Sequence, residues 1–165
     1  SDVCSSDLGG PFVTELFDEV GSVLSQKGHE FGTNTGRARR CGWFDMVAFK
    51  RSCFINSTTG ICLTKLDVLD SLEEIKICVG YKKGCQMIET PIFSVEEWSS
   101  WEPVYEIVKG WKQPTSSCSS LQALPYEARV YLDKIQSYCK TPLSFVSLGP
   151  EREKTVILKD IYDAS

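Results

Sequence analysis

Three segments of the chain place apolar residues at the 3.6-residue spacing of an amphipathic helix. In the first, residues 14–28, Thr14 can cap the N-terminus and Gly28 can end the helix. The second covers about residues 45–55 and begins with an aspartate that can cap it. The third covers residues 124–138 and has a proline in its first turn, where proline is well tolerated. The pattern therefore predicts three helices.

Shorter apolar segments have the patterns of strands. Residues 60–64 form a continuous apolar run bounded by glycine, the profile of a strand buried on both faces. Residues 74–81 alternate apolar and polar positions. A turn at Lys83-Gly84 predicts a hairpin partner near residues 86–90.

A last pair of strands is expected at residues 143–146 and 155–158, on either side of a turn at Gly149-Pro150. The length of 165 residues leaves room for one compact domain or for part of a larger one.

The remaining segments lack periodicity. Residues 31–42 are expected to be a loop, and residues 94–120 a loop with short helical turns. Residues 1–8 are rich in serine and aspartate, and we interpret them as an irregular lead-in or a scar.

Composition excludes several functions. The 165 residues include 18 Lys+Arg and 22 Asp+Glu, which gives a formal net charge of −4. That balance argues against an electrostatic grip on nucleic acid or on an anionic membrane, so any anion site must be local. No apolar window approaches the roughly 20 residues of a membrane span, and no export signal is visible.

Eight cysteines do not indicate a disulfide framework in a chain of this size and composition, so we expect free, mostly buried thiols. No two cysteines stand two to four residues apart, and His29 is the only histidine, which makes a local zinc site improbable. His29 itself is expected at the surface or at a helix cap.

Residues 33–40 concentrate hydrogen-bond donors. The segment carries two threonine hydroxyls, an asparagine amide, and the guanidinium groups of Arg37, Arg39 and Arg40. Arginine offers a planar fork that suits carboxylate or phosphate, so an anion site is one reading. A solvated basic loop is the alternative.

Thr64-Lys65-Leu66-Asp67 stands at the end of a predicted strand. An ionised carboxylate can accept both donors of a guanine edge, N1–H and the N2 amine, while a lysine stem can lie along the purine face. The turn at residues 147–150 could offer backbone groups to the same base. The alternatives are ordinary exposed residues and a plain strand connection. The chain shows no phosphate-binding loop, nucleophile elbow or Cys–His arrangement, so we identify no complete catalytic set.

Six stretches, in this order, resemble the C-terminal part of adenylosuccinate synthetase. They are residues 10–16 (GPFVTEL), 31–43 (FGTNTGRARRCGW), 62–70 (CLTKLDVLD), 74–81 (EIKICVGY), 103–106 (PVYE) and 147–150 (SLGP). The resemblance extends from about Gly9 to the end, so residues 9–165 are expected to be the C-terminal portion of that domain and residues 1–8 to be foreign to it.

The resemblance implies a ligase that joins IMP to L-aspartate in AMP biosynthesis, with GTP as co-substrate and Mg²⁺ as cofactor. It also implies roles for individual residues. The loop that closes over L-aspartate corresponds to Thr33, Asn34, Thr35, Gly36, Arg37, Ala38 and Arg39, where Arg37 also reaches IMP and Arg39 lies near GTP. The guanine-binding segments correspond to Lys65, Leu66 and Asp67 and to Ser147, Leu148 and Gly149. The family usually has threonine where this chain has Asn34 and Leu148, so position 148 must act through its backbone.

The fold implied is α/β, the C-terminal part of a mixed-sheet, GTP-binding synthetase fold similar to P-loop NTPases. The catalytic residues, the magnesium ligands and most of the IMP site belong to the family's N-terminal part, so the chain alone is expected to be inactive. A cytoplasmic homodimer without nucleic-acid or membrane partners is expected for the full-length enzyme. The alternative functions are a non-catalytic guanine-nucleotide-binding module and, third, a purely structural domain.

Overall fold

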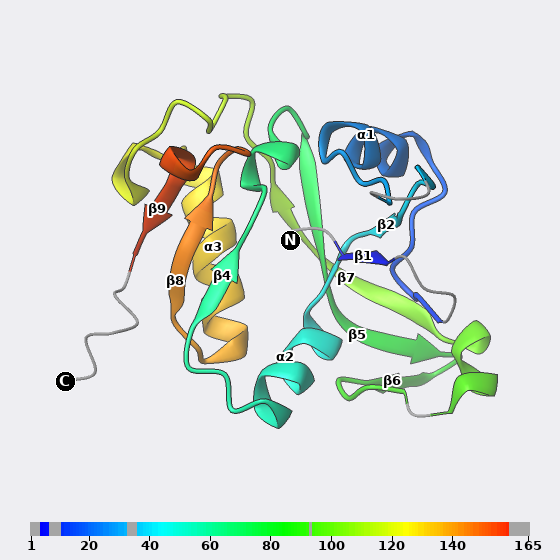
Figure 1. Ribbon diagram of the computed structural model, residues 1–165. Coiled ribbons are helices and arrows are strands. Elements are labelled where there is room, and N and C mark those ends of the chain that lie inside the picture. Colours follow the sequence, from blue (N-terminus) through cyan, green and yellow to red (C-terminus); the bar gives the residue numbers. More distant parts are fainter. Residues whose placement is uncertain (1–3, 7–10, 33–35, 93, 159–165) are drawn as a thin grey trace. The chain divides into compact units, whose positions relative to one another are not determined.

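A computed structural model describes residues 4–6, 11–32, 36–92 and 94–158. The chain divides into two compact units. The first contains Ser52–Ile75 and the chain from Val108 onward, and the second contains Val3–Arg51 and Lys76–Ile107. Each unit holds a mixed sheet with helices, which agrees with the expected α/β class (Figure 1).

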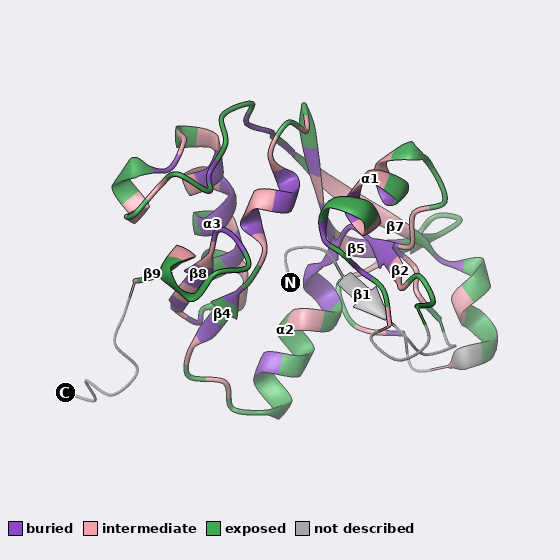
Figure 2. Ribbon diagram, turned by 45° about the horizontal axis from the view of Figure 1, so that its top comes forward, coloured by how far each residue is buried: buried purple, intermediate pink, exposed green. Residues whose placement is uncertain are grey.

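The first unit is built on a sheet of three described strands in the order β4-β8-β9. Strand β4 (Ile61–Leu63) is parallel to β8 (Leu143–Ser147), and β9 (Thr155–Ile157) is antiparallel to β8. Helix α3 (Tyr126–Cys139) lies along one face of this sheet. The buried residues of α3 are Ala128, Tyr131, Leu132 and Ile135, and Figure 2 shows the helix coloured by burial.

The strand pair at the end of the chain and the third helix are thus confirmed. The expected burial of the first strand on both faces is wrong for the described residues, because Cys62 in the middle of β4 is exposed while Ile61 and Leu63 are buried. The described part of the unit also contains three short 3-10 turns, η1 (Leu66–Leu69), η3 (Leu121–Ala123) and η4 (Arg152–Lys154).

The second unit is built on β5 (Glu74–Lys83), which pairs with β3 (Phe44–Asp45) in parallel and with β6 (Gln86–Ile88) in an antiparallel hairpin. The predicted turn is confirmed, with Gly84 at a φ of 59° that suits glycine. A hydrophobic core cluster of the second unit consists of Val47, Cys78, Tyr81, Ile92 and Trp101.

A strand within residues 94–120 was not foreseen. The predicted short helical turn is present as η2 (Val95–Ser100), but β7 (Glu102–Lys109) follows it and pairs with β5. Only Val108 of β7 is buried, so the strand lacks the strict alternation that would have revealed it.

The first helix begins later than expected. Helix α1 is Glu19–Lys27, and its cap is Asp18, whose Oδ1 accepts from the Gly21 N–H at 3.0 Å. Thr14 instead lies in a turn before the helix, and its carbonyl accepts from Trp43 N at 3.1 Å. The end of the helix at Gly28 is confirmed.

Two segments expected to be irregular contain strands. Part of the expected loop is β2 (Arg40–Gly42), and part of the lead-in is β1 (Cys4–Ser6), which is antiparallel to β2. Whether residues 1–8 are foreign to the family portion stays a prediction.

The thiols are less buried than expected. Cys41, Cys53 and Cys78 are buried, whereas the other four cysteines whose environment is described are exposed or intermediate; all seven are free thiols. Within the described ranges, no helix is both long and apolar enough to cross a membrane.

Asp45 joins two elements of the second unit. It precedes α2 (Met46–Ile55) and caps it, as predicted, by accepting from Ala48 N at 3.0 Å. Its other oxygen accepts from the Tyr81 hydroxyl on β5 at 2.6 Å. Burial raises the pKa of the Asp45 carboxyl, and the hydrogen bond from Tyr81 opposes this rise.

We expect Tyr81→Phe to reduce stability more at pH 7 than at pH 4. The folded pKa of Asp45 lies above its unfolded value, so its ionisation weakens folding as the pH rises from about 4. Without the hydroxyl that pKa rises further. The free energy of unfolding should fall by about 1–3 kcal/mol at pH 7 and by less at pH 4, measured by urea unfolding.

Tyr126→Phe is the matched control, because Tyr126 is 69% exposed and loses the same oxygen. Equal losses for Tyr81→Phe at the two pH values would contradict the role given to the buried carboxylate.

Candidate functional site

The two segments singled out for guanine recognition leave the same edge of one sheet. In the parallel pairing of β4 with β8, Leu63 stands opposite Val146. Because parallel strands end on the same side, the chain after Leu63 and the chain after Val146 emerge next to each other. Segments about eighty positions apart in the sequence are thereby brought together, as Figure 1 shows for β4 and β8.

The first segment turns sharply after β4. Lys65 adopts a left-handed conformation with a φ of 63° and starts the 3-10 turn η1. Leu66 and Leu69 are completely buried and anchor this turn, and Asp70 N donates to the Asp67 carbonyl at 3.1 Å. Non-glycine residues in this conformation carry strain, and the buried leucines are what hold the turn in place.

Asp67 is the carboxylate that η1 presents at this edge. Its Oδ1 is buried and, among the described residues, has no hydrogen-bond partner. Burial raises the pKa of the Asp67 carboxyl; the negative charges of Asp70 and Glu151 add to the rise, while Lys65 opposes it. A buried acceptor without a donor is costly, so this oxygen is suited to accept a hydrogen bond from a ligand.

The second segment has a fixed backbone. Ser147 Oγ donates to the Gly149 carbonyl at 2.8 Å, and Leu148 N donates to the Lys154 carbonyl at 2.9 Å. The Leu148 side chain is completely buried, so only the backbone at this position can face a ligand. A leucine at this position is therefore compatible with the expectation that position 148 acts through its backbone.

Gly149 leaves room at the edge that a side chain would fill. A Cβ at this position would lie 3.2 Å from Lys154 Cγ and 3.3 Å from a Glu151 carboxylate oxygen. Both distances are tighter than ordinary contacts, so glycine allows the backbone and its neighbours to approach each other.

The candidate L-aspartate loop belongs to the second unit. Thr33, Asn34 and Thr35 lie outside the described residues, so only the base of the loop is visible. Gly32 N donates to the Arg37 carbonyl and Gly36 N to the Gly32 carbonyl, both at 2.8 Å. A bridge between Phe31 and Ala38 closes the base below them.

The three arginines of this segment have different environments. Arg37 is exposed. Arg39 Nη1 donates to the carboxylate of Glu30 at 3.1 Å, and that carboxylate is almost fully buried. Arg40 forms a two-point ion pair with Glu15, Nε to Oε1 at 2.9 Å and Nη2 to Oε2 at 2.5 Å.

Arg40 therefore serves the fold. The hydrogen bond to Glu15 raises its pKa, and its guanidinium also lies 5.3 Å from the centre of the Phe12 ring. The reading of Arg37, Arg39 and Arg40 as one anion-binding set included a residue that pairs within the protein. The sequence alone did not reveal Glu15 as the partner of Arg40.

Sequence reasoning also assigned no role to Asp70 and Lys154. The Asp70 side chain accepts from Trp111 Nε1 at 2.6 Å and from Thr115 N at 2.8 Å, and Lys154 Nζ donates to the Ser116 carbonyl at 2.7 Å. The one available signal was the spacing of Asp70, three residues after Asp67, which a single 3-10 turn brings onto one side. Across the described ranges, no group of three or more His, Cys, Asp or Glu is arranged to hold a metal ion.

Comparison with known proteins decides the family. The sequence model of adenylosuccinate synthetase matches residues 4–156, which is most of the chain. The chain belongs to the adenylosuccinate synthetase family. Adenylosuccinate synthetase from Mannheimia succiniciproducens is 46% identical over 162 residues, and the enzyme of that name from Alcanivorax borkumensis is 52% identical over 148 residues.

The fold agrees with that of a solved adenylosuccinate synthetase. The fully ligated enzyme from Plasmodium falciparum superposes with a TM-score of 0.91 at 41% sequence identity, over 96% of this chain. The chain spans only part of these proteins: 38% of the M. succiniciproducens protein, 34% of the A. borkumensis protein and 38% of the P. falciparum chain.

Proposed function

We propose that this chain is the C-terminal part of an adenylosuccinate synthetase, and that within the enzyme it recognises the guanine base of GTP and helps to bind L-aspartate. The complete enzyme would be a ligase that joins IMP to L-aspartate with GTP as co-substrate. The observation that carries the proposal is the meeting of residues 65–67 with residues 147–149 at one edge of the β4-β8 pair, with Asp67 on a turn whose leucines are buried.

The chemistry of Asp67 favours guanine over other bases. An ionised carboxylate accepts hydrogen bonds and donates none, so it matches the N1–H and N2 amine of guanine. Xanthine carries an oxygen where guanine has the amine, and that oxygen would face the carboxylate unfavourably. The stem of Lys65 can cover one face of the base, and the backbone of residues 147–149 can contact another edge.

Residues 33–39 would form the L-aspartate loop, with Arg37 reaching both aspartate and IMP and Arg39 near GTP. The exposed guanidinium of Arg37 has the planar geometry for a two-point contact with a carboxylate. The ion pair between Arg39 and Glu30 would orient the Arg39 guanidinium.

Proton transfer and Mg²⁺ binding would be supplied by the rest of the enzyme. Mg²⁺ would neutralise charge on the transferring phosphoryl group. The described residues offer no carboxylate cluster for it, so this chain would contribute positioning and base selectivity. The family resemblance also supports a sheet similar to that of P-loop NTPases and a cytoplasmic homodimer, and it supports the expectation that the chain alone has no ligase activity.

Asp67→Asn in the full-length synthetase that carries this chain should change the preferred nucleotide. The asparagine side chain offers one acceptor, its carbonyl oxygen, and one amide NH2 donor group. That NH2 group suits the 2-oxo oxygen of xanthine. We expect kcat/KM for GTP to fall by at least about 100-fold and the ratio of XTP to GTP use to rise, because buried mismatched groups discriminate strongly.

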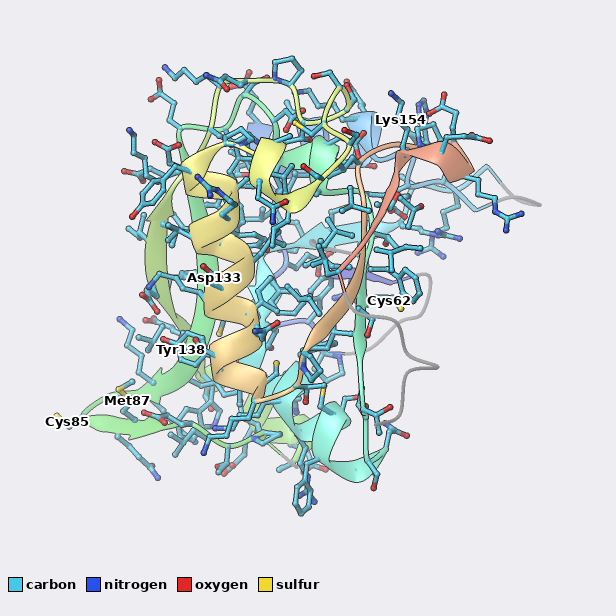
Figure 3. All side chains as sticks on the ribbon, turned by 90° about the vertical axis from the view of Figure 1, so that its left-hand side faces the viewer. Cys62, Cys85, Met87, Asp133, Tyr138 and Lys154 are labelled. Atoms are coloured by element: carbon cyan, nitrogen blue, oxygen red, sulfur yellow. The ribbon has the colours of Figure 1, made fainter. Side chains whose placement is uncertain are left out.

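Asp133→Asn is the matched control: Asp133 is exposed on α3, where Figure 3 labels it, and lies outside both guanine segments. Unchanged kcat/KM values for both nucleotides in Asp67→Asn would remove Asp67 as the guanine reader.

Arg37→Lys tests the L-aspartate loop in the same enzyme. Lysine keeps the charge but cannot make the two-point contact, so the aspartate KM should rise, or kcat fall, by at least about tenfold. The exposed Arg51 of α2 provides the control substitution Arg51→Lys. Steady-state kinetics with aspartate and IMP identical to the parent would show that Arg37 is only a solvated residue.

A further inference from the structure

A segment of the first unit contacts one residue beyond each of the two candidate guanine segments. Residues 111–116 follow β7 and carry no regular secondary structure of their own. They contact Asp70, directly after η1, and Lys154, at the end of η4. We call residues 111–116 the strap.

The contact with Asp70 is made by three donors of the strap. Trp111 Nε1 reaches Oδ1 at 2.6 Å, Thr115 N reaches Oδ2 at 2.8 Å, and the Thr115 hydroxyl reaches Oδ1 at 3.0 Å. Trp111 is 2% exposed and Thr115 is completely buried, so water competes little for these bonds. Ser71 N also donates to the Trp111 carbonyl at 3.0 Å, which fixes the chain just after η1.

The strap is also held in the core of the unit. The Trp111 ring lies 6.1 Å from the ring of Tyr131 on α3, and both side chains are buried. The end of η1 is therefore linked through Asp70 to a residue that packs on the helix, and its position depends on more than the local turn.

The contact with Lys154 is made by a single, solvent-exposed acceptor at the other end of the strap. Lys154 Nζ donates to the Ser116 carbonyl at 2.7 Å. The backbone of the same lysine contacts the second guanine segment, since its carbonyl accepts from Leu148 N at 2.9 Å, and its Cγ lies close enough to Gly149 that a Cβ there would be 3.2 Å away. Figure 3 labels Lys154, the last residue of η4.

We propose that the strap sets the spacing between the two guanine-reading segments, with Asp70 and Lys154 as positioning residues for GTP selectivity. This inference rests on the proposed function. Asp70 fixes the turn that presents Asp67, and Lys154 fixes the backbone around Gly149. Because both are tied to the strap, a base between the segments meets acceptors and backbone groups already held in place.

Removal of one tie should weaken GTP binding and leave the chemical step intact. Lys154→Met keeps the unbranched stem beside Gly149 and removes only the ammonium group. In the full-length synthetase we expect the KM for GTP to rise about three- to tenfold, with kcat and the KM values for IMP and aspartate unchanged, since one charge-assisted bond is lost. Lys154→Arg, which can still donate to the Ser116 carbonyl, should restore the KM.

Lys112→Met is the matched control. Lys112 belongs to the same strap and its ion pair with Glu73 is exposed at both ends, but it contacts neither Asp70 nor Lys154 in the bonds described. A purely structural strap would give the two variants the same kinetics, and an unchanged GTP KM in Lys154→Met would overturn the proposal.

Thr115→Val tests the other tie with little change in side-chain volume. It removes the hydroxyl bonds to Asp70 and keeps the bond from Thr115 N, so the GTP KM should again rise severalfold while XTP use relative to GTP increases. A fall in kcat together with equal rises in the KM values of all substrates would indicate general destabilisation and contradict the proposed role of the strap.

The comparison with Asp67→Asn separates the two proposals. If Asp67→Asn changes nucleotide choice while Lys154→Met and Thr115→Val do not, the proposed role of the strap is wrong and the proposed function stands. If Asp67→Asn also changes nothing, guanine recognition at this edge is itself contradicted.

Discussion

The parallel pairing of β4 with β8 is the contact on which the candidate guanine site depends. It aligns Leu63 with Val146, so that two segments far apart in the sequence emerge at one edge. Helix α3 makes this pairing stable by burying its apolar stripe against the sheet, and Gln136 on that helix accepts from Leu143 N at 3.0 Å at the start of β8. A shift of one residue in this register would turn Val146 out of the core and displace the second segment.

At that edge, two neighbouring carboxylates have different hydrogen-bond environments. Burial raises the pKa of Asp67, whose Oδ1 has no donor among the described residues, whereas the neighbouring Asp70 carboxylate accepts from three donors. The satisfied carboxylate holds the chain in place, and the unsatisfied one is suited to a ligand. This difference between neighbouring acids is the physical basis for assigning one a positioning role and the other a binding role.

Local sequence signals were sufficient where the structure is locally determined. Asp45 caps α2 and Gly84 turns the β5-β6 hairpin, as predicted, because caps and turns depend on adjacent residues. The start of α1 was misplaced because Thr14 pairs with Trp43, a contact no periodicity reveals, and β7 was missed because its burial is irregular. For the site, sequence named the guanine segments through a family resemblance, but their shared edge and their ties to residues 111–116 required the fold.

The most direct test of the account is to locate guanine binding on the chain itself. Titration of the isotope-labelled chain with GDP, followed by amide NMR shifts, should move the signals of Leu66, Asp67 and Gly149 more than those of α1 or β6. Xanthosine diphosphate should produce much smaller changes at the same amides, since its 2-oxo group cannot donate to Asp67. Absence of shifts at these residues with GDP, or equal shifts with both nucleotides, would contradict guanine recognition at the β4-β8 edge.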